Sequence, residues 1–308
     1  MSHTKSLSGH TTVLLDEAVD LLVQSRTGHY VDGTFGRGGH SRLILSRLAE
    51  SGRLTGIDKD PEAVAAGNEL MASDRRFAIR HGSFADIAKL ASSGLDGLLL
   101  DLGVSSPQLD DPARGFSFLR DGPLDMRMNP HSHPHAAEWL ATVPQAELAD
   151  VLKRFGDERF ARRIATAIVA ARQEIPIERT AQLAKIVADA HPAWPKRVHP
   201  ATKTFQAIRI FINSELVDLQ KVLDESVALL RPGGRLVVIS FHSLEDRIVK
   251  RFMRRHERGQ DLASWVAVTE DMLDKKLKRV GKGRRALADE IEDNPRARSA
   301  VMRVAERL

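Results

Sequence analysis

The segment Tyr30–His40, which reads YVDGTFGRGGH, constrains the fold of this chain more than any other. It predicts a buried strand that ends at Asp32, then a glycine-rich turn, then a helix from about Ser41 to Leu48. Glycine reaches positive φ without strain and lets a ligand approach the main chain closely. A strand, a glycine turn and a helix in this order are typical of the place where an α/β sheet binds a nucleotide-like cofactor.

The spacing of the glycines disfavours a dinucleotide. The NAD and FAD fingerprint is G-x-G-x-x-G, and the glycines at 33, 36, 38 and 39 do not fit that frame. Asp32 would repel a pyrophosphate but suits a cofactor with an ammonium group, such as S-adenosylmethionine. Loops that bind this cofactor resemble acid-x-G-x-G-x-G, and here Thr34 replaces the first glycine. Taken alone, the motif is also compatible with an ordinary tight turn.

A second strand, Leu54–Asp58, ends in another carboxylate. Asp58 follows Gly38 by about 20 residues, the separation expected for a carboxylate that binds a ribose diol. A helix N-cap is the alternative role for Asp58. Asp60 fits the cap better because a proline follows it, and proline is favoured in a first helical turn. We therefore expect Asp58 to be free for the ribose hydroxyls.

The composition bounds the class of protein. A chain of 308 residues is long enough for two domains, and 28% charged with 42% hydrophobic residues is typical of a globular protein. There is no apolar run of about 18 residues, and Met1–Gly9 lacks the apolar core of a signal peptide. The absence of cysteine excludes disulfides, thiolate catalysis and Cys-ligated zinc. We expect a cytoplasmic protein that does not enter a membrane.

The net charge of +5 and the pI of about 9.6 favour a polyanionic partner. Basic residues gather in two clusters near the C-terminus, each of which could also be a solvated helix face or tail. The first cluster contains Arg247, Lys250, Arg251, Arg254, Arg255 and Arg258, and the second contains Lys275, Lys276, Lys278, Arg279, Lys282, Arg284 and Arg285. Two such clusters favour contact with phosphates, and the affinity should then fall steeply with salt.

Strands and helices alternate through the first hundred residues, which predicts a doubly wound α/β domain with a parallel sheet. The expected elements are a helix over Val13–Leu22 and strands over Tyr30–Asp32, Leu54–Asp58, Phe77–His81 and Leu95–Gly103. Ligands of such sheets bind at the carboxyl ends of the strands. Asp32, Asp58, the Gly82–Phe84 turn and Asp101 fall at those ends.

The pattern changes between Leu109 and about Asn213, where helices are predicted without a clear strand. These helices are Ala136–Leu140, Gln145–Phe155, Glu158–Gln173 and Thr180–Ala190. A helix over Glu215–Leu230, a Pro-Gly-Gly turn and a strand over Gly233–Ser240 then resume the α/β pattern, and the last strand is expected at Ala300–Val304. We predict a core of residues 1–108 and 214–308, with an inserted helical domain of residues 109–213 that recognises the substrate.

The loop Asp101–Gln108 follows the fourth strand and should face the cofactor. Amino-group methyltransferases carry an acid or Asn there, followed by Pro-Pro-aromatic, which accepts hydrogen bonds from the target amino group and stacks on its base. The Pro-Pro-aromatic part is missing here. Ser105, Ser106 and Gln108 could make hydrogen bonds instead. An ordinary strand-to-helix turn is the alternative.

From about His10 to Arg307, long blocks of the chain resemble the bacterial 16S ribosomal RNA cytosine-N4 methyltransferase family. The blocks are Asp32–His40, Asp101–Asp111, Arg114–Phe118, Gly122–Met128, His199–Arg209, Ser240–Arg247 and Asn294–Ser299. The resemblance implies S-adenosylmethionine as methyl donor and N4 of a decoding-region cytosine in the small ribosomal subunit as acceptor. It also implies a helical domain inserted in a Rossmann-like core. The segment Gln260–Lys282 matches least.

The resemblance also implies specific cofactor contacts. They fall on Gly38, Gly39, His40, Asp58, Phe84, Asp101 and Gln108. The two glycines would let the loop approach the methionine end, and Asp58 would bind the ribose hydroxyls. Phe84 would pack on the adenine, although a plain core position is an equal alternative. Asp101, the catalytic candidate, would accept a hydrogen bond from the cofactor amino group or the target amino group.

Methyl transfer should be direct, so positioning is its main demand. The N4 lone pair of cytosine is delocalised into the ring, and an acceptor such as Asp101 would help it lose a proton. The base must be unstacked or presented from a single strand. We expect Lys203, Arg209, His242 and Arg247 to hold the RNA, with helix capping or a position at the edge of the core as an equal alternative for His242.

Other interpretations of the sequence concern a metal site and different substrates. His131, His133 and His135 lie in a polar loop without an expected carboxylate partner at helical spacing, and methyl transfer needs no metal, so we expect none. A DNA amino-methyltransferase and a non-catalytic RNA-binding factor on a methyltransferase fold are the alternatives. An NAD enzyme is disfavoured by the glycine frame. A homodimer, and the choice between free rRNA and an assembled subunit, stay open.

Overall fold

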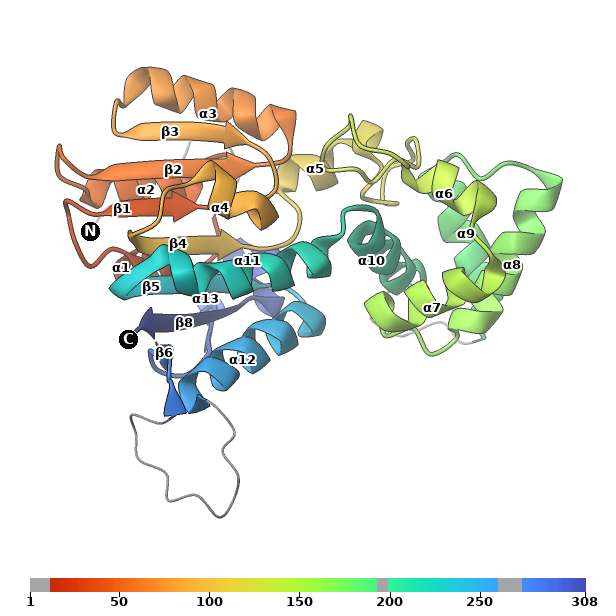
Figure 1. Ribbon diagram of the computed structural model, residues 1–308. Helices are drawn as coiled ribbons and strands as arrows, with labels where there is room; N and C mark the ends of the chain where they lie inside the picture. The colour runs from red at the N-terminus through yellow and green to blue at the C-terminus, as the bar shows by residue number, and fades with distance from the viewer. Residues whose placement is uncertain (1–11, 193–198, 260–272) are drawn as a thin grey trace, which may run out of the picture. The chain divides into compact units, whose positions relative to one another are not determined.

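The computed structural model describes residues 12–192, 199–259 and 273–308 (Figure 1). These residues form two compact units. The first takes the described residues of Met1–Gly103 and Leu216–Leu308, and the second takes Val104–Glu215. Each unit has its own hydrophobic core. The Met1–Gly9 segment and much of Gln260–Lys282 lie outside the described residues.

The first unit is built on one 8-stranded sheet with the order β3-β2-β1-β4-β5-β8-β6, and β7 also pairs with β8. Strands β1 to β5 are parallel, whereas β8 is antiparallel to β5. The strands are β1 (His29–Asp32), β2 (Arg53–Asp58), β3 (Phe77–His81), β4 (Leu95–Asp101), β5 (Leu230–Ser240), β6 (Leu277–Arg279), β7 (Arg284–Arg285) and β8 (Val301–Arg307). The predicted Rossmann-like α/β sheet is confirmed.

Helices cover both faces of this sheet because its central strands are apolar on both sides (Figure 1). In β4, Leu99 packs toward one face, and Leu98 and Leu100 pack toward the other. The face of Leu99 is covered by α1 (Leu15–Leu22), α2 (Gly39–Arg47), α3 (Pro61–Ser73) and α13 (Ala288–Asp293). The opposite face is covered by α4 (Ile87–Leu90), α11 (Glu215–Leu229) and α12 (Ser243–Arg258).

The strand β5 begins earlier than predicted. The Pro-Gly-Gly turn at 232–234 was expected to separate the helix from the strand, but α11 ends at Leu229 and β5 starts at Leu230. Leu95 of β4 pairs with Leu230, but Gly97 pairs with Arg235, so the register shifts between them. The Pro-Gly-Gly residues of β5 therefore form an irregularity within the strand instead of ending it. Gly233 accommodates it with a φ of 79°.

The second unit is helical around a single core. Its helices are α5 (Ser106–Asp110), α6 (Ala136–Thr142), α7 (Gln145–Gly156), α8 (Ala161–Glu174), α9 (Thr180–Ala190) and α10 (Ala201–Ile212). Helix α8 starts later than the predicted Glu158 because Asp157 leaves α7 with positive φ and the Glu158 carboxylate accepts from the Phe160 N–H at 2.8 Å. Within the described part of this unit, the sole β-bridge joins Pro123 and Arg179.

Candidate functional site

A group of acidic and polar side chains lies at the carboxyl ends of β1, β2 and β4 in the first unit. Asp32 ends β1 and is 1% exposed. It accepts hydrogen bonds from the Ser41 hydroxyl at 2.7 Å and from the Thr34 N–H at 3.2 Å. Burial raises the pKa of Asp32 to about 6, although these two hydrogen bonds oppose the shift. This carboxylate fixes the turn to the start of α2.

The glycine turn contains backbone with positive φ, which residues other than glycine rarely adopt. Gly38 has a φ of 76° and is the N-cap of α2, which begins at Gly39, earlier than the predicted Ser41. A Cβ on Gly38 would lie 2.7 Å from the Phe35 ring, and one on Gly39 would lie 1.9 Å from the Thr12 hydroxyl. Gly36 also has positive φ, but a Cβ there would meet only the Thr34 carbonyl, at 3.9 Å. The turn is therefore packed beneath Gly38 and Gly39 and open beside Gly36.

Asp58 ends β2, and its two carboxylate oxygens accept from the backbone N–H groups of Gly36 at 2.8 Å and Asp60 at 2.9 Å. The Asp60 side chain accepts from the Glu62 N–H at 3.0 Å and caps α3, which confirms that prediction. As predicted, Asp58 does not cap α3, but both of its oxygens already have backbone partners because the same cap places the Asp60 N–H against it. Its bonds to the ribose hydroxyls stay a prediction. Each oxygen keeps a second lone pair for a ligand.

Asp101 ends β4, and its backbone N–H donates to the Thr34 hydroxyl at 2.6 Å. The side chain is 23% exposed, yet its Oδ1 is buried and has no hydrogen-bond partner among the described residues. Burial, followed by the nearby charges of Asp32 and Glu245, raises the pKa of Asp101 well above its usual range. Asp101 thus differs from Asp32 and Asp58 in having an oxygen that nothing in the described structure binds.

His40 lies on α2 beside Asp101, with its Nδ1 3.6 Å from the Asp101 Oδ2. The imidazole is 4% exposed, and its Nε2 has no partner among the described residues. Burial lowers the pKa of His40 to about 4, opposed by a hydrogen bond with the Val13 backbone. His40 is therefore neutral at pH 7, and its contact with Asp101 is not an ion pair.

Phe84 begins the short 3-10 helix Phe84–Asp86 after β3. Its ring is half-buried against the core beneath α11 and α12, and the Lys59 Nζ lies 5.8 Å from the ring centroid. The alternative prediction, that Phe84 is a plain core residue, is therefore confirmed in part. Phe84 follows the carboxyl end of β3, and the neighbouring strand β2 ends at Asp58.

Gln108 belongs to the second unit, on α5. It is 6% exposed, and its Oε1 accepts from the Ser105 N–H at 2.9 Å as part of a capping box. These contacts fit the alternative prediction that the loop Asp101–Gln108 is an ordinary strand-to-helix turn. A Ser three residues before a Gln is a recognised capping signal, and it would have pointed to this role of Gln108.

Comparison with known proteins identifies the family. A sequence profile described as the MraW methylase family matches residues 7–308. The chain belongs to the MraW methylase family. It is also 57% identical over 305 residues to the ribosomal RNA small subunit methyltransferase H of Chromohalobacter salexigens, an alignment that covers 97% of this chain and 92% of the relative.

Two solved structures resemble this chain at low sequence identity. An rRNA methylase from Streptococcus thermophilus gives a TM-score of 0.40 at 10% identity, covering 95% of this chain and 93% of that one. The N-methyltransferase NodS from Bradyrhizobium japonicum gives 0.39 at 11% identity, with the same coverage of 95% and 93%. These scores are too low to support an argument about the site.

The residues predicted to hold RNA have different surroundings in this methylase. In the second unit, the Lys203 Nζ donates to the Asp157 carbonyl at 2.9 Å, and the Arg209 guanidinium makes two 2.8 Å hydrogen bonds to the Glu215 carboxylate. In the first unit, His242 is the N-cap of α12 and accepts from the Glu245 N–H at 3.4 Å, whereas Arg247 is exposed. The structure therefore supports the capping alternative for His242.

Two further features of the sequence were misjudged. His133 and His135 each lie 3.4 Å from the Glu138 carboxylate, so the polar histidine loop does have a carboxylate partner. Ser41 and Thr34 hold Asp32 and Asp101, and neither was identified as a site residue. A Ser in the first turn of the helix that follows an acidic strand end is the signal that would have pointed to Ser41.

None of the described helices has the length and hydrophobicity needed to cross a bilayer.

Proposed function

We propose that this chain transfers a methyl group from S-adenosylmethionine to the N4 amino group of a cytosine in the decoding region of 16S rRNA. The family and the 57% identity to a small-subunit rRNA methyltransferase support the reaction class and the substrate. One structural observation carries the assignment to a site. The carboxylate of Asp101 has a buried oxygen without a described partner, and it lies at the strand ends where such a sheet binds its ligands.

The residues at these strand ends fit S-adenosylmethionine. Asp32, Asp58 and Asp101 supply negative charge and hydrogen-bond acceptors, which suit an ammonium group and ribose hydroxyls but not a pyrophosphate. The space beside Gly36 lets a ligand reach the main chain. The N–H groups of the first turn of α2 suit a carboxylate, since Gly38 gives that helix no side-chain cap.

Each residue then has a separate task. The remaining lone pairs of Asp58 would accept from the ribose hydroxyls, and the exposed part of Phe84 would pack on the adenine. Gly38 and Gly39 would receive the methionine end. Bound S-adenosylmethionine supplies a methyl group already activated by the sulfonium.

Asp101 would act on the acceptor amino group. Its carboxylate, whose side chain is 23% exposed, can accept a hydrogen bond from the cytosine N4, which localises the nitrogen lone pair for attack. The same carboxylate can take the proton that N4 loses, and its raised pKa makes it a stronger base than an ordinary Asp. His40 lies against Asp101 and would limit the orientations of its carboxylate.

The second unit would recognise the substrate, and Gln108 would contact the cofactor, as the family resemblance implies. We place the protein in the cytoplasm, where small ribosomal subunits are its substrate, and a homodimer is compatible with the proposal. Sedimentation of the purified protein reports the oligomeric state.

A labelled-methyl assay tests the proposed reaction. The protein would be incubated with S-adenosylmethionine carrying a labelled methyl group and with 30S particles, naked 16S rRNA or duplex DNA. We expect N4-methylcytosine in 16S rRNA, in particles, free RNA or both, and none in DNA. Label in DNA would instead support a DNA amino-methyltransferase. RNA binding without label in any substrate would support a non-catalytic RNA-binding factor.

A further inference from the structure

Helix α12 has a basic face that the contacts of its own unit do not explain. Leu244, Val249 and Phe252 of this helix are buried against the sheet. Arg247, Lys250, Arg251 and Arg254 lie at i, i+3, i+4 and i+7, a spacing that places them on one side of a helix, and all are exposed. Among the described residues, no acidic group forms an ion pair with any of these side chains.

The acidic residues of α12 are already used in the fold. The Asp246 carboxylate binds the Arg303 guanidinium of β8 at 2.6 Å, and Glu257 binds Arg279 of β6. Glu245 is 2% exposed and accepts from the backbone N–H of Phe241 at 2.8 Å. These interactions tie the helix to the edge of the sheet, and they leave the positive charge on its outer side without an acidic partner among the described residues.

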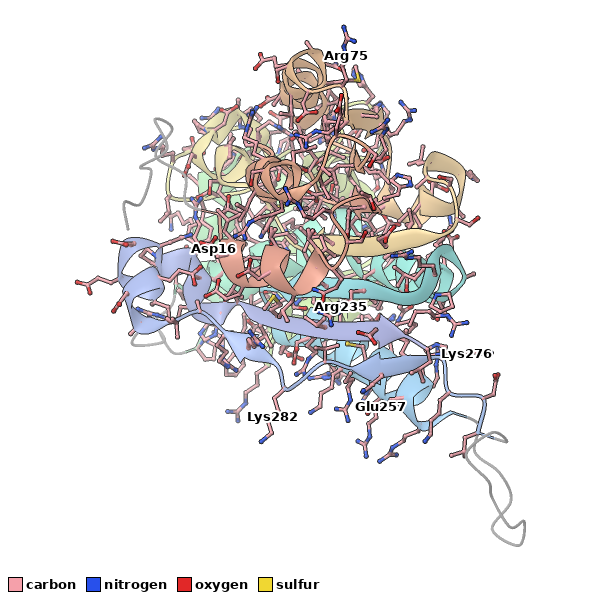
Figure 2. All side chains as sticks on the ribbon, turned by 90° about the vertical axis from the view of Figure 1, so that its left-hand side faces the viewer. Asp16, Arg75, Arg235, Glu257, Lys276 and Lys282 are labelled. Carbon is pink, nitrogen blue, oxygen red and sulfur yellow. The ribbon has the colours of Figure 1, made fainter. Side chains whose placement is uncertain are left out.

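The edge of the sheet continues this surface. Both β6 and β7 pair with β8, and Arg285 of β7 and Lys282, which lies between the two strands, are exposed. The ion pairs from Arg279 and Arg303 join this edge to α12. In Figure 2, Lys282 and Glu257 lie on the same lower side of the first unit, with Arg75 on the opposite side. We call the side chains of Arg247, Lys250, Arg251, Arg254, Lys282 and Arg285 the α12 basic face.

The α12 basic face begins next to the candidate site. Helix α12 follows β5 directly, and Ile239 of β5 is the register partner of Asp101. A Cβ on Gly103, which follows β4, would lie 3.7 Å from the Phe241 ring at the start of α12. Arg247 is one helical turn farther on, and the other basic residues of the helix extend away from the strand ends.

We infer that the α12 basic face binds the phosphate backbone of the rRNA strand whose cytosine enters the site at Asp101. The inference rests on the proposed function. Unpaired Lys and Arg side chains in a row neutralise phosphates without reading base sequence, so they set the position of the strand. A membrane surface is disfavoured because the outer side of α12 has no exposed large hydrophobic residue to insert.

A paired substitution tests this inference on the full chain. Arg251→Gln with Arg254→Gln removes two charges from the α12 basic face, and Arg75→Gln with Arg80→Gln removes two exposed charges near β3 as the control. Losing two contacts to single-stranded RNA should reduce the salt slope of binding to protein-free 16S rRNA by about 1.4. That corresponds to about 10- to 30-fold weaker binding at 0.1 M salt.

The expected pattern is a higher KM for RNA, an unchanged rate at saturating RNA and unchanged affinity for S-adenosylhomocysteine, with none of these changes in the control. A salt slope equal to that of the wild type would overturn the inference. So would a loss of activity on 30S particles with unchanged binding to free RNA, since that result points to a protein partner. The binding arm needs no methyl transfer, so it can fail independently of the proposed reaction.

Discussion

Asp58 and Asp101 end the two strands that flank β1, yet their carboxylates are held in different ways. Both oxygens of Asp58 accept from backbone N–H groups, whereas Asp101 has one oxygen without a described partner. Backbone bonds fix a carboxylate in one position and favour its charged form. A carboxylate without them can bind and release a proton. Asp58 and Asp101 thus occupy equivalent positions in the sheet. Their different hydrogen bonds suit Asp58 to binding and Asp101 to the chemical step.

Asp101→Asn should have the largest effect on this comparison. The amide cannot take the proton from N4, so we expect the single-turnover rate of methyl transfer to fall by about 100- to 10,000-fold. Affinity for S-adenosylhomocysteine, measured by calorimetry, should change by only a few-fold. Asp86→Asn, at an exposed position of the same unit, is the matched control and should keep the wild-type rate. A rate for Asp101→Asn close to that of the wild type would remove Asp101 from the chemistry.

Asp58→Asn should weaken cofactor binding and leave the rate of methyl transfer unchanged, the reverse of Asp101→Asn. The loss of a charged acceptor for the ribose hydroxyls costs about 1.5–3 kcal/mol, or roughly 10- to 100-fold in the Kd for S-adenosylhomocysteine. The rate at saturating cofactor should stay near that of the wild type. The new NH2 group would also face the N–H of Gly36 or Asp60, so the Tm should fall. A large loss of rate at saturation would contradict the separation of roles.

The pH dependence should give the smallest effect. Burial raises the pKa of both carboxyl groups, and that of Asp101 is raised well above its usual range. Only the ionised form of Asp101 accepts a proton, so the single-turnover rate should fall on acidification below this pKa, by at most about tenfold per pH unit. Cofactor affinity should persist to lower pH. Retention of the acidic limb in Asp101→Asn, or loss of cofactor binding before the rate, would refute this order.

The sequence predicted the first unit well where one strong pattern dominates. The apolar run ending at Asp101 could only be a strand buried on both faces, and β3 has the predicted bounds, Phe77–His81. The cap at Asp60 was also predictable because a proline follows it. Short strands such as β6 and β7 carry no such pattern, because their charged residues face solvent and only β8 makes them strands.

The hydrogen bonds of the site were harder to predict than its position. The sequence predicted that Asp58 is a carboxylate at the end of a strand. The two hydrogen bonds that its carboxylate accepts, from the N–H groups of Gly36 and Asp60, depend on how the turn at Gly36 folds back over β2. His242 was equally compatible with RNA contact and with capping, and the bond from Glu245 N–H supports the second. The roles assigned to the cofactor and RNA residues, and to the helical unit, stay predictions.

The pairing of β4 with β5 also sets an order of folding. Leu98 lies beside Leu236 in the sheet, although the whole second unit separates these strands along the chain. Contacts between residues so distant in sequence form late, because the intervening loop must close first. The strand that completes the environment of Asp101 therefore comes from a part of the chain that is synthesised only after the whole second unit.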